Sequence, residues 1–222
     1  MMVRSEQERI GVGDIRTERA AALVATAAEF YRRGWCLGTS GNFSAVLREA
    51  PLELLITGSG LDKGALAPED FVRVDAAGRA CPGETGRASA ETLLHLAVYR
   101  ARGARSVLHT HSVAATLLGE HFAEKGGLTL AGYEMLKGLE GTSSHETEEF
   151  VPVLANSQDM ELLAREVGAT LAERPASHGF LLAGHGLYTW GAELAEAQRH
   201  VEILEFLLAL VLHRTRLAPF GG

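Results

Sequence analysis

Val107-Leu108-His109-Thr110-His111-Ser112 joins the end of an apolar run to two histidines that alternate with hydroxyl residues. Successive side chains of a β-strand point to opposite faces, so this spacing places His109 and His111 on one face. Two imidazoles held side by side by a strand form part of a metal site. A catalytic zinc ion usually has three protein ligands, so the chain must supply a third from elsewhere.

A second histidine motif follows the apolar run Phe180–Ala183, which is typical of a buried strand. His185 stands between Gly184 and Gly186, and glycines there let the backbone turn tightly while the imidazole projects from the turn. We therefore predict His185 as the third ligand. Spacing alone leaves an alternative open, because three histidines that serve only packing would fit the same pattern.

Composition sets broad limits on the class of protein. The chain has 222 residues, of which 46% are hydrophobic and 22% charged, with a formal net charge of -7. These values predict a single globular domain over residues 1–222, with residues 1–16 as a flexible N-terminus. The chain has no basic arm that would neutralise phosphates, so we do not expect it to bind nucleic acid.

Neither a membrane span nor a disulfide is predicted. The longest apolar run, Ile203–Leu212, is too short to cross a bilayer and is interrupted by Glu205. The polar N-terminus does not resemble a signal peptide, and Cys36 and Cys81 form no C-x-x-C pair. We therefore expect a cytoplasmic protein without a disulfide framework.

Alternating helical and strand patterns predict an α/β layered domain. Helices are expected over residues 17–33, 89–100 and 192–214, and Thr17 and Ser89 are the expected N-caps of the first two. Strand direction does not follow from the pattern. Glu91 lies near the start of the second helix, where a carboxylate complements the helix dipole without any further role.

Two glycine-rich loops with hydroxyl side chains stand at predicted strand ends. The first contains Ser40, Gly41 and Asn42, and the second contains Thr57, Gly58, Ser59 and Lys63. Such loops can turn backbone N–H groups toward an anion, although a plain turn is the commoner explanation of each. Neither matches a nucleotide-binding motif, so no nucleotide fold is predicted.

Several segments together resemble the class II aldolase and adducin-head family over almost the whole chain. The matching segments are Thr39–Ser44, Ile56–Gly60, Ser89–Glu91, His109–His111 and His185–Gly186. Within the family the chain is most similar to the branch that dehydrates 5-methylthioribulose 1-phosphate in methionine salvage. Glu134–Gly138 and the sequence His185–Gly191 carry this narrower match, while Tyr133 departs from the glutamine of those relatives.

The resemblance implies an α/β/α fold with a mostly antiparallel central sheet and one Zn²⁺ per subunit, held by His109, His111 and His185. It assigns proton transfer to Glu134, with a raised pKa expected for that carboxylate. It also implies a homotetramer with active sites near subunit interfaces. The residues that it places around the substrate and its phosphate are Ser40, Gly41, Asn42, Thr57, Gly58, Ser59, Lys63, Ser89 and Glu91.

Alternatives to the dehydratase remain on the same scaffold. In sugar-phosphate aldolases of the family, the position that matches Glu91 is the acid–base group, so a class II aldolase or a pentulose-phosphate 4-epimerase is the runner-up. A non-catalytic interaction module of the adducin type is the least favoured reading, because all three histidines are present here.

Overall fold

The computed structural model describes the backbone of residues 3–217 and the side chains of residues 15–214. Within this range eight strands form one sheet in the order β3-β2-β1-β4-β8-β7-β6-β5. Neighbouring strands run antiparallel, with the exception of the parallel pair β6 and β7. The strands are β1 (Asn42–Glu49), β2 (Leu52–Thr57), β3 (Phe71–Asp75), β4 (Ser106–Thr110), β5 (Gly127–Leu130), β6 (Glu149–Leu154), β7 (Gly179–Leu182) and β8 (Gly186–Gly191).

Helices cover both faces of this sheet, which confirms the predicted α/β/α fold with its mostly antiparallel sheet. The helices are α1 (Val3–Arg32), α2 (Thr92–Arg102), α3 (Val113–His121), α4 (Met160–Glu173) and α5 (Leu194–Leu217). Short 3-10 turns occur as η1 (Pro68–Asp70), η2 (Ala123–Lys125) and η3 (Glu134–Gly138). No helix within residues 3–217 is long and apolar enough to cross a membrane.

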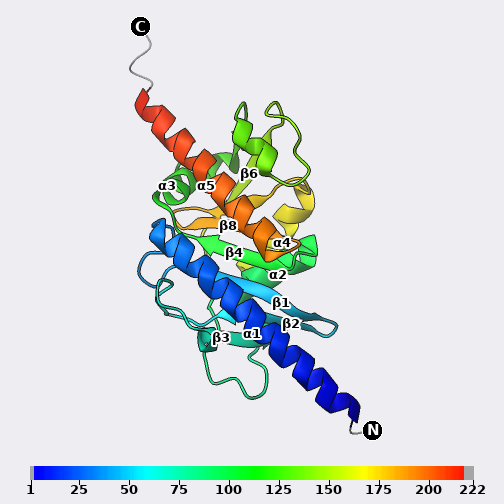
Figure 1. Cartoon of the computed structure of the whole chain (residues 1–222). Helices are drawn as coiled ribbons and strands as arrows, with labels where there is room; N and C mark the ends of the chain where they lie inside the picture. The colour runs from blue at the N-terminus through cyan, green and yellow to red at the C-terminus, as the bar shows by residue number, and fades with distance from the viewer. Residues whose placement is uncertain (1–2, 218–222) are drawn as a thin grey trace.

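The two sheet faces bury separate apolar cores. Residues of α2 and α4 pack with Val107 and Tyr188 on one face, whereas residues of α1 and α5 pack with Leu108 on the other. Figure 1 shows α1 and α5 crossing in front of the sheet, with α2 behind it. Because Val107 and His109 share a face of β4, the metal-ligand side of this strand faces α2.

Two predicted helix starts are wrong. The first helix begins at Val3, so Thr17 lies inside it and is not an N-cap. The second begins at Thr92, with Glu91 at the N-cap position. Ser89 instead belongs to the preceding loop, where its backbone N–H donates to the carbonyl of Thr57 at 3.1 Å.

The sheet brings the candidate site residues together at one end of its central strands. In the register of β4, His109 lies opposite Asn42 of β1 on one side and Tyr188 of β8 on the other. His185 lies in the tight turn between β7 and β8, after Gly184 with its left-handed φ of +64°. The same end of the sheet therefore holds residues that are more than 140 positions apart along the chain.

Candidate active site

The three predicted histidines converge. One nitrogen from each of His109, His111 and His185 lies within 4.8 Å of the others, and these are the residues of the described chain that could hold a metal together. The Nε2 atoms of His109 and His185 are 3.3 Å apart. Tetrahedral zinc at ~2.0–2.1 Å from its nitrogen ligands separates them by about 3.3 Å, so the spacing fits.

Metal binding requires neutral imidazoles, and the surroundings of His109 and His111 favour that form. Burial, aided by the two neighbouring imidazoles, holds the pKa of His109 well below its ordinary value. Burial also lowers the pKa of His111 to about 4, with a further contribution from His185. His109 Nδ1–H donates to the Leu187 carbonyl at 2.9 Å, which fixes the ring and leaves Nε2 for a metal.

Close backbone approach at Gly186 makes this cluster possible. A Cβ atom built on Gly186 would lie 2.0 Å from the carbonyl oxygen of Thr110 and 3.2 Å from a ring carbon of His109. Only glycine therefore lets β8 start directly beside the end of β4. The Gly-His-Gly motif thus serves the site through its second glycine as well as through its histidine.

Glu91 lies directly beside the histidine cluster. Its Oε1 is 3.2 Å from His185 Nε2, and its Oε2 is 3.5 Å from His109 Nε2. The ring of Tyr188 stacks on His109 with centroids 3.9 Å apart, and the nearby Glu91 carboxylate adds to the effect of burial in raising the Tyr188 pKa. A carboxylate in this position can serve as a further metal ligand or as a base.

A chain of buried hydrogen bonds holds Glu91 from behind. The Asn42 amide donates to Glu91, and its Oδ1 lies 2.5 Å from His95 Nε2. His95 Nδ1 in turn lies 2.5 Å from the hydroxyl of Ser44, which contacts the Tyr99 hydroxyl at 3.1 Å. Because burial lowers the pKa of His95 to about 3, the ring is neutral and offers one donor and one acceptor. His95 therefore orients Asn42 rather than binding a ligand.

A cavity of about 290 Å³ opens beside the cluster. Most of the predicted substrate residues line it together with two of the histidines: Ser40, Gly41, Asn42, Gly58, Ser59, Lys63, Ser89, Glu91, His111 and His185. Thr57 is the exception among the predicted loop residues. It is fully buried and its Oγ1 accepts the N–H of Phe43 at 3.2 Å, so it joins the loops instead of facing the cavity.

Lys63 lies at the base of both loops with only 2% of its surface exposed. Its ammonium donates to the Thr39 carbonyl at 3.0 Å and to the Leu61 carbonyl at 2.6 Å. Burial lowers its pKa, while nearby acidic groups that include Asp62 and Glu91 partly offset the effect. The ammonium thus fastens the two loops to each other and places a cation beneath the cavity.

Sequence reasoning missed three further residues that line the cavity, Asn156, Gln158 and Met160. Asn156 and Gln158 lie between β6 and α4 and Met160 is the first residue of α4, whereas His185 follows β7. Because β6 and β7 are parallel, the segments after both strands emerge at the same edge of the sheet. A known strand direction would have revealed them, but the sequence pattern left direction open.

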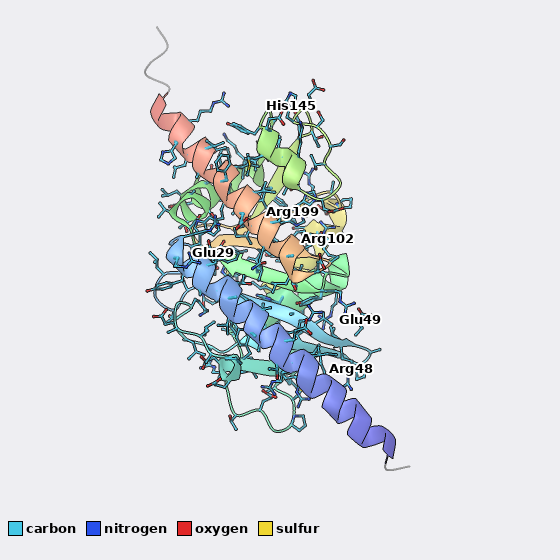
Figure 2. The ribbon with its side chains drawn as sticks, viewed as in Figure 1. Glu29, Arg48, Glu49, Arg102, His145 and Arg199 are labelled. Atoms are coloured by element: carbon cyan, nitrogen blue, oxygen red, sulfur yellow. The ribbon has the colours of Figure 1, made fainter. Side chains whose placement is uncertain are left out.

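Glu134 lies outside this cavity. It is on η3, its side chain is 70% exposed, and its carboxylate pairs with Lys137 at 2.7 Å and His145 at 3.3 Å. Hydrogen bonding from Lys137 lowers the Glu134 pKa, so the expected rise does not occur in the single chain. Figure 2 shows its partner His145 at the outer end of the molecule, opposite Arg48 and Glu49.

Comparison with known proteins agrees with the fold and with the histidine cluster. Residues 21–212 match the family described as the class II aldolase and adducin N-terminal domain. The chain belongs to this family, as the sequence predicts. This match also supports metal dependence, without saying which metal the histidines hold.

Two relatives within this family carry the same enzyme name. The chain is 45% identical to the methylthioribulose-1-phosphate dehydratase of Sorangium cellulosum over 194 residues, which cover 87% of this chain and 91% of that protein. It is 46% identical to the protein of the same name from Methylococcus capsulatus over 193 residues, or 86% and 92% of the two chains.

Solved structures share the fold. The l-fuculose-1-phosphate aldolase of Thermus thermophilus superposes with a TM-score of 0.71 at 30% identity, over 93% of this chain and all of that chain. YgbL of Escherichia coli, a putative aldolase/epimerase/decarboxylase, has a TM-score of 0.73 at 27% identity over 89% and 90%.

Proposed function

We propose that the protein is a zinc-dependent dehydratase that converts 5-methylthioribulose 1-phosphate to 5-methylthio-2,3-dioxopentyl 1-phosphate and water in methionine salvage. The carrying observation is that three convergent histidines lie beside a cavity lined by two hydroxyl-rich loops. The sequence identity of 45% and 46% to two proteins named methylthioribulose-1-phosphate dehydratase supports the choice of substrate. A cytoplasmic homotetramer, predicted from the sequence, is part of the same proposal.

His109, His111 and His185 would hold the Zn²⁺. When bound, the metal would polarise the C2 ketone of the substrate and acidify the proton on C3. The nitrogen separation, the lowered pKa of His109 and of His111, and the bond from His109 Nδ1–H to the Leu187 carbonyl support this ligand set. Direct metal analysis of the purified protein tests the choice of zinc.

The phosphate would lie between the two loops. Ser59 and Ser89 line the cavity and offer hydroxyl donors, whereas the Ser40 hydroxyl already donates to the Leu37 carbonyl at 2.8 Å. The backbone N–H groups of Gly58 and Ser59 likewise donate to backbone carbonyls, so the side chains supply the donors. The ammonium of Lys63 adds positive charge from below while it holds both loops. A dianionic phosphate anchored here would leave the ketose carbons directed toward the histidines.

Proton transfer is assigned to Glu134 of a neighbouring copy. A base must remove the C3 proton, and the same group in its acid form can protonate the departing C4 hydroxyl as water; the resulting enol then ketonises. Glu134 is exposed and does not line the cavity of its own chain, so its participation requires another subunit. Glu91, beside His185, is the alternative base within one chain.

Product analysis distinguishes the enzyme classes. Incubation with 5-methylthioribulose 1-phosphate should yield the diketone phosphate and water. Cleavage of fuculose 1-phosphate would instead favour an aldolase, and epimerisation of ribulose 5-phosphate would favour an epimerase. Absence of bound metal together with absence of turnover would favour the adducin-type module.

Mixed oligomers test the assignment of Glu134. Co-expressed E134Q and H185A chains, purified through two different tags, should regain part of the activity that each variant lacks alone. Recovery requires a site with histidines from one chain and Glu134 from the other. No recovery in purified mixed oligomers would place the base within one chain and transfer the role to Glu91.

A further inference from the structure

Glu205 is a carboxylate buried in the apolar half of α5. It has 2% of its surface exposed, and its helix neighbours Leu204, Leu207 and Leu208 are fully buried. Burial raises the pKa of Glu205 to about 7, with hydrogen bonding from Ser112 and Thr110 as the opposing effect. An ionisable group in such surroundings costs stability, and an apolar side chain of similar volume often replaces it without loss.

Glu205 contacts the end of β4, the strand that carries His109 and leads directly into His111. Thr110 Oγ1–H donates to Glu205 Oε1 at 2.5 Å, and Ser112 lies close enough to the carboxylate to lower its pKa. The second oxygen, Oε2, is buried without a hydrogen-bond partner of good geometry among the described residues. Stability alone therefore does not explain why a glutamate stands here.

Strand alternation connects these partners to the histidines. Thr110 and Ser112 flank His111 and point to the α5 face, while His109 and His111 point to the cavity side. One carboxylate on α5 therefore binds the residue that directly precedes a proposed metal ligand. Ser112 has a second task, because its hydroxyl accepts the N–H of Ala115 and caps α3.

His111 needs such support because it lies beyond the regular sheet. The β4–β8 ladder ends at the pair of Thr110 and Leu187, so no strand partner fixes the residue that follows. The backbone of His111 is held by one hydrogen bond, from its N–H to the Trp35 carbonyl at 2.7 Å. The side-chain bond of Thr110 to Glu205 fixes the chain immediately before it, and the cap that Ser112 forms on α3 fixes the chain immediately after it.

We propose that Glu205 is a positioning residue for the metal site, which fixes the end of β4 from the opposite face of the sheet and so holds His111 in its ligating position. The inference rests on the proposed metal site. It assigns Glu205 no contact with the metal or the substrate. Loss of its contacts should therefore weaken metal binding while the fold persists.

The test measures zinc affinity, by competition with a chelator, in variants whose folding is checked by circular dichroism. E205M removes the acceptor at similar volume, and its zinc dissociation constant should rise about 10- to 100-fold, as for other groups that support ligands. L208M, an apolar change in the same helix, is the matched control and should bind zinc like the original protein. Equal affinity of E205M and the original protein would overturn the proposal.

A double-mutant comparison tests the contact between Thr110 and Glu205 without relying on the E205M variant alone. T110V deletes the hydroxyl that binds Glu205, so its effect and that of E205M should not add in the double variant. Additive losses would contradict a shared contact and overturn the proposal, as would a T110V variant with unchanged affinity. Should E205M not fold, E205L replaces it in both experiments, because leucine also lacks an acceptor. Failure of the original protein to bind zinc would instead refute the metal site on which the inference rests.

Discussion

Two carboxylates illustrate two ways in which the chain places an acidic group. Glu91 is held by partners from distant parts of the chain, with Asn42 on β1 and His185 before β8. Glu134 pairs only locally in the described structure, with Lys137 and His145. One folded chain therefore fixes the position of Glu91 beside the histidines, whereas the proposed role of Glu134 requires another chain.

The largest effect is expected from the histidines, on which both carboxylates depend for a reaction. H185A should lose bound metal and lower kcat/KM by at least about 10³-fold, because a Lewis acid contributes several kcal/mol to transition-state stabilisation. Metal content and turnover are measured on the same sample. H121A, which changes an exposed histidine, is the control and should retain both. Full metal occupancy in H185A would exclude His185 as a ligand.

The E134Q variant distinguishes the roles of Glu134 and Glu91 in proton transfer. This variant should keep its metal and its melting temperature, because the side chain is exposed, yet kcat should fall by about 10²- to 10⁴-fold. E146Q alters another exposed glutamate of the same region and should be fully active. Normal turnover of E134Q would leave Glu91 as the remaining candidate for proton transfer.

A smaller effect, on KM, is expected from Lys63, which joins the two glycine-rich loops near Glu91. K63M removes the ammonium that binds the Thr39 and Leu61 carbonyls, so KM for a phosphorylated substrate should rise about 10- to 100-fold. Steady-state kinetics and inhibition by inorganic phosphate measure it. K63R should not restore the value, because a planar guanidinium differs in geometry from an ammonium. An unchanged KM in K63M would show that the hydrogen bonds of Lys63 to the two loops are not needed for substrate binding.

The smallest effect is expected on the stability of the fold, through His178, which contacts the segment that follows Glu134. Burial disfavours the charged form of His178, but Glu149 at 2.9 Å and the Glu140 carbonyl raise its pKa above the model-peptide value of 6.5. A raised folded-state pKa contributes stability that is complete below pH 6.5 and is lost as pH rises through the folded value.

Urea unfolding should therefore give a free energy that declines on that upper side of pH 6.5. H178Q should remove this part of the decline, because no titrating group remains at the position. A pH dependence identical in H178Q and the original protein would contradict the assignment. The experiment shows whether the contacts of His178 with Glu140 and Glu149 hold the segment that follows Glu134.

The sequence was sufficient for the histidine cluster because strand alternation and a Gly-His-Gly turn have few structural solutions. It was insufficient for Ser89, whose helix start looked regular but whose backbone pairs with Thr57 across the chain. Asn156 and Met160 were missed since they depend on strand direction, which local periodicity does not encode. The proposed role of Glu134 requires another copy of the chain, a relation that no single-chain pattern encodes.

The parallel pairing of β6 and β7 has a consequence for how this enzyme can change through evolution. It brings Asn156, Gln158 and Met160 to the cavity on a segment that carries none of the three histidines. Substitutions there can reshape one wall of the cavity without replacing a proposed ligand. Selection can therefore alter substrate preference and metal chemistry independently, which suits a scaffold shared by dehydratases and aldolases.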